Sequence, residues 1–293
     1  MKLASYPKGN QDKICLCEPH GCILLERINR QFDRDWPCDL QGLINSGQVN
    51  ELNAWYLGGG RERLTEVKAE AFGGEKSPFS PLYRHPPKIW GIGLNYAEHA
   101  ADLSAKTPTG IPGSFMKPDS TIIGPGETIQ IPVMSHKTTA EAELGVVISK
   151  KCRNVSEDNW LDVVAGFTTI IDMTAEDILR QNTRYLTVAK SFDTFFSFGP
   201  QLVTPDEIED VSALTVSTII NGRVHAENVV ANMTFPPPFL VAFLSRVMTL
   251  LPGDIISTGT PGAVAINDGD VVECRIDGFE SLINPVRDLK VDH

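Results

Sequence analysis

The sequence predicts an α+β fold that is rich in β-strands and built on a curled or barrel-like sheet. From Lys88 onward, short segments rich in β-branched residues recur, among them ETIQIPV, AELGVVIS and DVVECRI. Turn signals such as Asn221-Gly222 and Asp268-Gly269 separate these segments. From Lys88 onward, clear helical character is confined to three stretches, at residues 157–164, 175–181 and 239–250. Many strands with few helices are typical of a curled or closed sheet.

The first 75 residues predict a smaller N-terminal domain. The run ICLCEPHGCILLE has two apolar arms around residues 18–21 and predicts a hairpin. Two helices are expected around residues 40–44 and 49–57, and the second ends at three consecutive glycines. The proline-rich stretch that follows interrupts regular structure. We therefore expect a domain at 1–75, a linker at 76–87 and a catalytic domain at 88–293.

Composition and charge narrow the class of protein. The content of 42% hydrophobic and 22% charged residues is typical of a globular protein, and the formal net charge is −11. An acidic chain without a basic patch argues against binding to nucleic acid or to an anionic membrane. The sequence has neither a signal peptide nor a run of roughly 20 apolar residues that could span a membrane. These features predict a cytoplasmic protein.

Three of the six cysteines lie close together in the sequence and could in principle bind zinc. Cys15, Cys17 and Cys22 form a C-x-C-x4-C run with His20 nearby, but no second pair follows at the spacing of a zinc site. Reduced thiols in a cytosolic protein are the preferred interpretation.

The most informative segment is a predicted strand that carries two glutamates. Side chains alternate along a strand, so Glu141 and Glu143 project from the same face and repel each other unless a cation lies between them. The pair alone fits a solvated acidic edge about equally well. Asp172, at the end of a second apolar strand, favours the metal site. Three carboxylates without Cys or His select Mg²⁺ or Mn²⁺ over zinc.

Two further stretches carry candidate catalytic residues. His99 and Asp102 would share one face if the stretch is helical, and the carboxylate could then orient the imidazole to activate water. Lys190 stands in an apolar, aromatic stretch, where a buried ammonium needs an anionic partner. That partner is either a substrate oxygen or Asp193. The turn at 258–262, with Thr260, could bind a carboxylate, although most such turns are only turns.

Six motifs in a fixed order resemble the fumarylacetoacetate hydrolase family, over residues 88–288. They are G-x-N-Y-x-x-H at 93–99, F-x-K-P at 115–118, E-x-E-L-x-V-V at 141–147, D-M-T-A-x-D at 172–177, K-S-F-D at 190–193 and P-G-D-I-I-x-T-G-T-P at 252–261. The resemblance implies a mixed β-roll core and usually a homodimer. It also assigns roles to residues of this chain: metal ligands at Glu141, Glu143 and Asp172, a water-activating pair at His99 and Asp102, and contacts to an oxo-acid at Lys190 and Thr260.

The helix after Asp172 departs from the family pattern. Many relatives read T-A-R-D-x-Q, whereas this chain has Glu176 and Leu179 in place of the arginine and glutamine. Arg180, one helical turn beyond Glu176, either pairs with Glu176 or supplies a displaced cation for the substrate. We therefore expect the metal ligands to be kept, and we expect the part of the substrate pocket farther from the metal to differ from that of typical relatives.

The predicted function is hydrolysis of a C–C bond in a 2,4-dioxo-acid (acylpyruvate-like) substrate through a metal-stabilised enolate. Decarboxylation of oxaloacetate or isomerisation of an unsaturated oxo-diacid would use the same site. A third interpretation is a binding or assembly protein that keeps the fold without catalysis.

Overall fold

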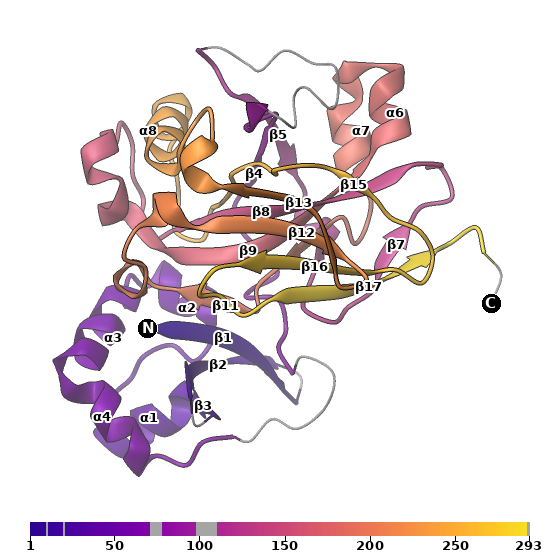
Figure 1. The fold of residues 1–293 in the computed structure, drawn as a ribbon. Coiled ribbons are helices and arrows are strands. Elements are labelled where there is room, and N and C mark those ends of the chain that lie inside the picture. The colour runs from indigo at the N-terminus through magenta and orange to yellow at the C-terminus, as the bar shows by residue number, and fades with distance from the viewer. Residues whose placement is uncertain (10, 20, 71–77, 98–109, 292–293) are drawn as a thin grey trace.

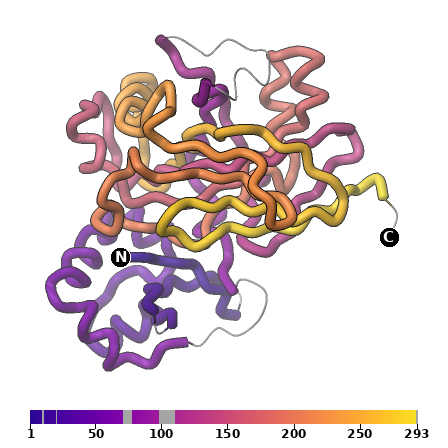
Figure 2. The backbone as a smooth tube through the Cα atoms, viewed as in Figure 1, coloured from indigo at the N-terminus to yellow at the C-terminus, as the bar shows by residue number. Residues whose placement is uncertain are grey.

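The computed structural model describes residues 1–293 except 10, 20, 71–77, 98–109 and 292–293. Two bodies are visible: an N-terminal body of strands and helices, and a larger strand-rich body that contains most of the rest (Figure 1). The tube view follows the indigo N-terminal segment along one side of the larger body (Figure 2). The strand-rich α+β fold expected from the sequence is confirmed. In the described part of the chain, every helix is too short or too polar to cross a membrane.

The N-terminal body is an antiparallel meander covered by helices. The expected hairpin is confirmed, because Cys17 lies opposite Cys22 and Glu18 opposite Gly21. The two expected helices are present, and the Asp39 side chain caps the first by accepting a 2.7 Å hydrogen bond from the Gly42 N–H. Its elements are β1 (Lys2–Lys8), β2 (Gln11–Glu18), β3 (Gly21–Leu24), α1 (Leu25–Phe32), α2 (Leu40–Asn45), α3 (Val49–Trp55) and α4 (Arg61–Arg63).

The larger body contains two sheets. The large sheet has the order β3-β2-β1-β11-β9-β8-β14-β4-β5, and the second sheet has the order β13-β12-β16-β17-β7. The remaining strands are β4 (Ile89–Gly93), β5 (Gly113–Lys117), β6 (Ile122–Ile123), β7 (Ile129–Ile131), β8 (Thr138–Ile148), β9 (Val164–Ala175), β10 (Phe196–Phe198), β11 (Gln201–Val203), β12 (Thr215–Ile220), β13 (Arg223–Val229), β14 (Ile255–Ser257), β15 (Val264–Ala265), β16 (Val271–Ile276) and β17 (Leu282–Asp288).

The N-terminal strands belong to the same sheet as the central strands. Leu3 of β1 pairs with Leu202 of β11, which in turn is joined to β9 through Val203 and Phe167. The two bodies therefore share a continuous set of backbone hydrogen bonds, which the sequence had not indicated. The division into a domain at 1–75, a linker at 76–87 and a domain at 88–293 stays a prediction.

The two faces of β8 and β9 meet different cores. Ala142 and Leu144 of β8 pack with Val216 and Val272 of the second sheet. On the opposite face, Val147 packs in the core formed with the N-terminal body. Both strands are buried along their whole length. A side chain on either face is therefore shielded from bulk water.

Helices cover the ends of the strands. The stretch expected at 157–164 is a 3-10 helix at Glu157–Val163, and the other two predicted stretches contain α-helices. Figure 1 shows the pair α6 and α7 beside the outer end of β5. Their bounds are α6 (Glu176–Gln181), α7 (Leu186–Lys190) and α8 (Pro237–Val247).

A buried ion pair holds the start of β4 to the strand beside it. Lys88 Nζ lies 2.6 Å from Asp254 Oδ2, and the Asp254 side chain is 2% exposed. The same oxygen accepts a hydrogen bond from the Leu251 N–H, whereas Oδ1 has no hydrogen-bond partner among the described residues. Burial raises the pKa of Asp254 despite the opposing effect of Lys88.

We expect Lys88→Met to lower the free energy of unfolding by about 2–4 kcal/mol at pH 7, because it leaves a buried carboxylate without its cation. The folded-state pKa of Asp254 already lies above its unfolded value, and the substitution raises it further. The loss is therefore small below about pH 4, where Asp254 is protonated, and grows as the pH rises. Urea unfolding at several pH values measures it, with the exposed Lys150→Met as control. A loss that does not vary with pH would contradict this account.

Candidate metal centre and active site

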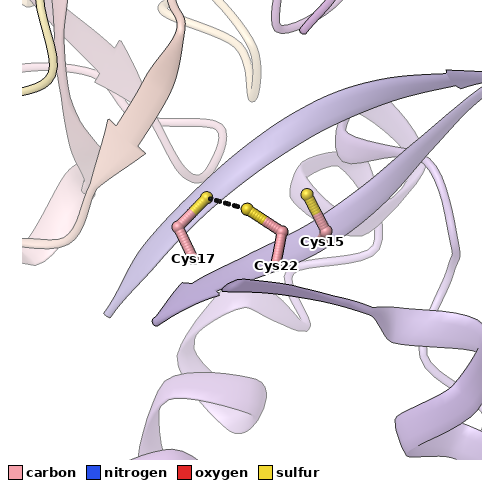
Figure 3. Close-up of side chains that lie close together, drawn as sticks. All are labelled: Cys15, Cys17 and Cys22. Atoms are coloured by element: carbon pink, nitrogen blue, oxygen red, sulfur yellow. Dashed lines mark hydrogen bonds between the residues drawn. The ribbon is translucent and has the colours of Figure 1, made fainter. Parts of the chain in front are cut away.

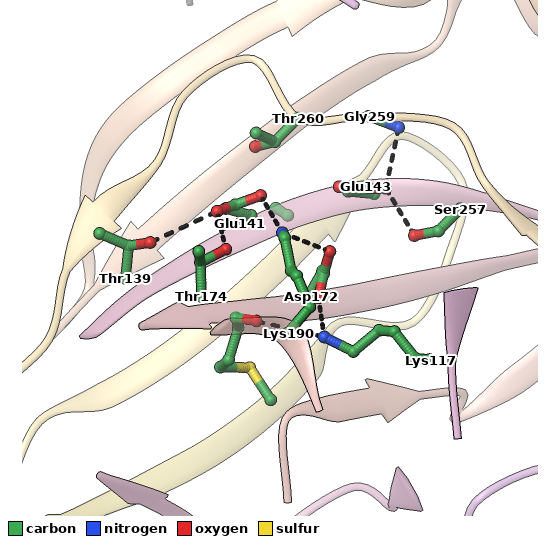
Figure 4. Close-up of polar contacts among 12 residues, drawn as sticks. Lys117, Thr139, Glu141, Glu143, Asp172, Thr174, Lys190, Ser257, Gly259 and Thr260 are labelled. Atoms are coloured by element: carbon green, nitrogen blue, oxygen red, sulfur yellow. Dashed lines mark hydrogen bonds and ion pairs between the residues drawn. The ribbon is translucent and has the colours of Figure 1, made fainter. Parts of the chain in front are cut away.

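The pairing of β8 with β9 brings three carboxylates together. Glu141 lies directly opposite Asp172 in the antiparallel register, and Glu143 is two residues further along the same face of β8. A carboxylate oxygen from each lies within 4.8 Å of the other two. The exposed fractions are 8% for Glu141, 1% for Glu143 and 0% for Asp172. The structure thus places the three predicted metal ligands in one buried cluster (Figure 4).

Hydrogen bonds from neighbouring strands orient the two glutamates. Glu143 Oε2 accepts from Ser257 Oγ at 2.5 Å and from the Gly259 N–H at 2.8 Å. Glu141 Oε1 accepts from Thr174 Oγ1 at 2.5 Å. These hydrogen bonds hold each carboxylate in a fixed direction.

A close backbone contact explains the glycine at 259. Its φ of +99° is unfavourable for other residues, and an added Cβ would lie 2.7 Å from the Cβ of Asn95. Asn95 is fully buried and donates to the Thr258 and Phe235 carbonyls at 2.7 and 2.9 Å. This asparagine fixes the turn whose N–H reaches Glu143.

Two buried lysines complete the cluster. Lys190, at the end of α7, places Nζ 2.7 Å from Asp172 Oδ2 and 3.0 Å from Glu141 Oε2. Lys117, at the end of β5, donates to Asp172 Oδ1 and, at 3.2 Å, to the Met173 carbonyl. The Lys190 ammonium also lies 4.6 Å from the centroid of the Phe115 ring. A substrate oxygen or Asp193 was expected as the partner of Lys190, and in the structure its anionic partners are Asp172 and Glu141.

The charges of the cluster are unbalanced. Three carboxylates face two ammonium groups, which leaves one excess negative charge in a buried site. Burial, followed by the charge of Asp172, raises the pKa of Glu143 to about 8. Burial lowers the pKa of Lys117 to about 8, whereas the three carboxylates raise the pKa of Lys190 in spite of its burial. The site therefore favours an additional positive charge at neutral pH.

The donor set fits a hard divalent cation. All three acidic groups offer oxygen, as Mg²⁺ and Mn²⁺ prefer, and their ligand atoms are already close together. The hydroxyl of the fully buried Tyr96 has no hydrogen-bond partner among the described residues, and the charge of Glu143 adds to burial in raising its pKa. A phenol beside the cluster can donate to a ligand oxygen.

The remaining predicted residues lie in different settings. Thr260 is 3% exposed, and its hydroxyl donates to the Gly262 carbonyl at 3.1 Å within its own turn. Arg180 pairs with Glu176, and Lys137 Nζ approaches the same carboxylate to 2.7 Å. The Arg180 side chain is 55% exposed. His99 and Asp102 lie outside the described residues.

Sequence reasoning had assigned no role to Lys117 or Ser257, whereas it had proposed that the turn at 258–262 binds a carboxylate, and the Gly259 N–H of that turn donates to the carboxylate of Glu143. Lys117 stood in the F-x-K-P motif, and its presence among apolar strand residues was the available signal. Ser257 had no comparable signal, and the choice of Glu143 as the carboxylate bound by the Gly259 N–H depends on the pairing of β14 with β8.

Comparison with known proteins identifies the family. Residues 88–287 match the fumarylacetoacetate (FAA) hydrolase C-terminal family model. The chain belongs to the fumarylacetoacetate hydrolase family. Oxaloacetate tautomerase Fahd2a, a mitochondrial protein of Rattus norvegicus, is 36% identical over 215 residues, which are 71% of this chain and 68% of that protein.

Solved structures of this family share the whole fold. Maleylpyruvate hydrolase from Sphingobium sp. SYK-6, in complex with manganese(II) ion and pyruvate, superimposes with a TM-score of 0.78 at 25% identity and covers 98% of this chain and 99% of its own. A 5-carboxymethyl-2-hydroxymuconate delta-isomerase from Mycobacterium smegmatis gives a TM-score of 0.72 at 28% identity, with 98% and 99% covered. The family thus includes proteins named for hydrolysis, isomerisation and tautomerisation.

We expect Glu143→Gln to keep the fold and to remove binding of Mn²⁺. The amide retains an oxygen for Ser257 and Gly259, and it relieves the charge repulsion in the metal-free protein, so the melting temperature without metal should stay equal or rise. Wild-type protein should gain about 2.7 kcal/mol of stability at a Mn²⁺ concentration of 100 times Kd, and the variant should gain none.

Thermal melts with and without Mn²⁺, together with titration calorimetry, measure both effects. The exposed Glu157→Gln serves as the matched control and should behave as wild type. An unchanged Mn²⁺ response in Glu143→Gln would exclude this residue as a ligand.

Proposed function

We propose that the chain is a divalent-metal-dependent enzyme that cleaves a C–C bond in a 2,4-dioxo-acid by hydrolysis, through stabilisation of an enolate. The observation that carries the proposal is the buried cluster of Glu141, Glu143 and Asp172 in contact with Lys190 and Lys117. A cluster of this kind has little value in packing, because burying five charged groups costs more than burying apolar side chains. Binding of a charged ligand would offset this cost and give the cluster a function.

The carboxylates of Glu141, Glu143 and Asp172 would hold Mg²⁺ or Mn²⁺. When bound, the metal supplies Lewis-acid polarisation of the 2-oxo group and charge to stabilise an enolate. The presence of manganese and pyruvate in the related maleylpyruvate hydrolase supports this assignment.

The two ammonium groups favour an anionic substrate. With a divalent cation added, the three carboxylates and two lysines carry one net positive charge, which matches a bound carboxylate or enolate. Lys190 and Lys117 can donate hydrogen bonds to oxygens that gain negative charge during the reaction. Both side chains are at most 5% exposed, so these contacts would form in a site with little water. Thr260 and Arg180 are further proposed substrate contacts, although Arg180 is already paired with Glu176.

Hydrolysis would need an activated water, for which His99 and Asp102 are the proposed pair. The water oxygen bonds to C4 of the substrate, the C3–C4 bond breaks, and a proton reaches C3. The products are a carboxylic acid and a 2-oxo-acid such as pyruvate. His99 would accept the proton of the attacking water, and Asp102 would orient its ring.

Tautomerisation of oxaloacetate is a second candidate. The observation that favours it is the 36% identity with oxaloacetate tautomerase Fahd2a over 215 residues. Tautomerisation moves a proton between carbon and oxygen of one molecule and consumes no water. Both reactions pass through an enolate, so the same lysines and carboxylates serve them.

A turnover screen with a matched variant decides between the two. Wild-type protein with Mg²⁺ or Mn²⁺ is assayed with acylpyruvates for acid release, and with oxaloacetate for keto–enol exchange and for carbon dioxide. We expect acylpyruvate hydrolysis, and we expect His99→Ala to lower its kcat by about 10²–10⁴-fold because general-base activation of water is lost. Exchange of oxaloacetate without acylpyruvate hydrolysis would assign the tautomerase. No turnover and no binding of oxalate, a mimic of the pyruvate enolate, would overturn an enzymatic function.

We expect Lys190→Met to lower kcat by about 10²–10³-fold while Mn²⁺ binding is kept or becomes tighter. The substitution removes a donor to the developing oxyanion, and it also removes a cation that competes for the oxygens of Glu141 and Asp172. Steady-state kinetics and Mn²⁺ titration are compared with the exposed Lys151→Met. A fall in Mn²⁺ affinity with unchanged kcat at saturating metal would show that Lys190 only organises the ligands.

A further inference from the structure

Three cysteines of the N-terminal body form a second cluster of reactive groups. Cys15 and Cys17 lie on β2 and project from the same face, and Cys22 lies on β3 opposite Cys17. Their sulfur atoms all lie within 4.8 Å of one another (Figure 3). The triad of carboxylates is formed by residues of β8 and β9, so this cluster is separate from the proposed active site.

Cys17 and Cys22 have the backbone arrangement that accepts a cross-strand disulfide. The Cys22 carbonyl accepts a hydrogen bond from the Glu70 N–H on the outer side of β3. The peptide groups of Cys22 therefore point away from β2, and Cys17 and Cys22 form a non-hydrogen-bonded pair. Such pairs have Cα atoms about 4.5 Å apart, within the range for disulfides. The two thiols are free, with 3.2 Å between their sulfur atoms.

Cys15 is less well placed to form a disulfide with Cys17 or with Cys22. It lies two residues from Cys17 along β2, a Cα separation of roughly 6.6 Å that is near the upper limit for a disulfide. It lies opposite Leu24, so its relation to Cys22 is diagonal. Its sulfur is fully buried and lies 3.6 Å from the Ala4 carbonyl. The geometry therefore selects the pair Cys17–Cys22.

The cluster is accessible from a polar cavity between the two bodies. Cys17 lines a cavity of about 540 Å³ together with Glu18, Tyr56 and Arg61 of the N-terminal body and Gln201 and Glu280 of the larger body. Cys17 is half-buried, and Cys22 is 6% exposed. Cys17 lines this cavity, and the Cys22 sulfur, which is not part of the lining, lies 3.2 Å from the Cys17 sulfur.

The cluster also favours one thiolate. The neighbouring side chains of Cys15 and then Cys17 lower the pKa of Cys22 well below its usual value, against the effect of burial. The neighbouring thiols have raised pKa values and keep their protons. A thiolate next to a protonated thiol is the arrangement in which a peroxide-oxidised cysteine is resolved by its neighbour.

We propose that Cys17 and Cys22 are a redox modification site that forms a reversible disulfide with hydrogen peroxide or a small organic hydroperoxide. The Cys22 sulfur attacks the peroxide, an S–O bond forms, the O–O bond breaks, and water or an alcohol leaves. The Cys17 sulfur then attacks the sulfenic sulfur, the S–S bond forms, the S–O bond breaks, and water leaves. With hydrogen peroxide, two thiols and one peroxide give one disulfide and two waters: sulfur is oxidised and peroxide oxygen is reduced. A dithiol reverses the reaction by exchange.

The test treats the reduced full-length protein with an equimolar amount of hydrogen peroxide and counts free thiols after denaturation. We expect two of the six thiols to disappear and to return with dithiothreitol. Peptide mapping should show a Cys17–Cys22 cross-link with the loss of two hydrogen atoms. Cys17→Ser should give no cross-link and should leave a sulfenic acid at Cys22 that dimedone traps.

Two further variants separate this site from general thiol oxidation. Cys152→Ser, which replaces another half-buried cysteine on a different element, should keep the cross-link and its rate. Cys15→Ala should also keep the Cys17–Cys22 cross-link, because Cys15 lies opposite Leu24 and is not part of the bond. The wild-type peptide map is decisive even if a variant fails to fold.

Three results would overturn the proposal. The first is no reversible thiol loss in wild type, and the second is a cross-link through Cys15. The third is a zinc ion retained through purification, found by metal analysis, whose removal by a chelator is required before the thiols react. The last result would assign the three cysteines to a metal site instead.

Discussion

The structure depends on the burial of three carboxylates on one face of two paired strands. Glu141, Glu143 and Asp172 are held together by the register of β8 and β9, and both strands are buried along their whole length. Like charges in such a setting destabilise the folded state unless other groups compensate. Lys190, Lys117 and the donors to Glu143 provide part of this compensation. The remainder is the physical reason to expect a cation.

The curl of the large sheet makes this compensation possible. In the order β9-β8-β14-β4-β5, the strand that carries Lys117 is four steps from the strand that carries Asp172, or roughly 19 Å in a flat sheet. Lys117 nevertheless contacts Asp172 and the Met173 carbonyl directly. The sheet must therefore roll so that its edge strand lies over its centre. The second sheet packs on the other face of β8, which leaves the rolled side for the site.

The altered helix after Asp172 has an explanation in local charge. Glu176 stands where the family pattern described above has arginine; it is buried, and Lys137 and Arg180 neutralise it. A cation is thus still present near this position, but it comes from other parts of the chain and is paired with an acid. The metal end of the proposed site and its distal end are consequently determined by different interactions.

The sequence by itself determined the strand-rich fold, the N-terminal hairpin and the side-by-side glutamates, because these depend on alternation and turn residues within one segment. It also placed Asp172 on a second apolar strand, although that strand does not end at Asp172 but continues to Ala175. Only the tertiary structure decided that Lys117, Ser257 and the Gly259 N–H reach the carboxylates, and that Cys17 faces Cys22 beside a cavity shared by both bodies. These contacts join segments far apart in the chain, and their geometry follows from strand order and the roll of the sheet, which no local pattern specifies.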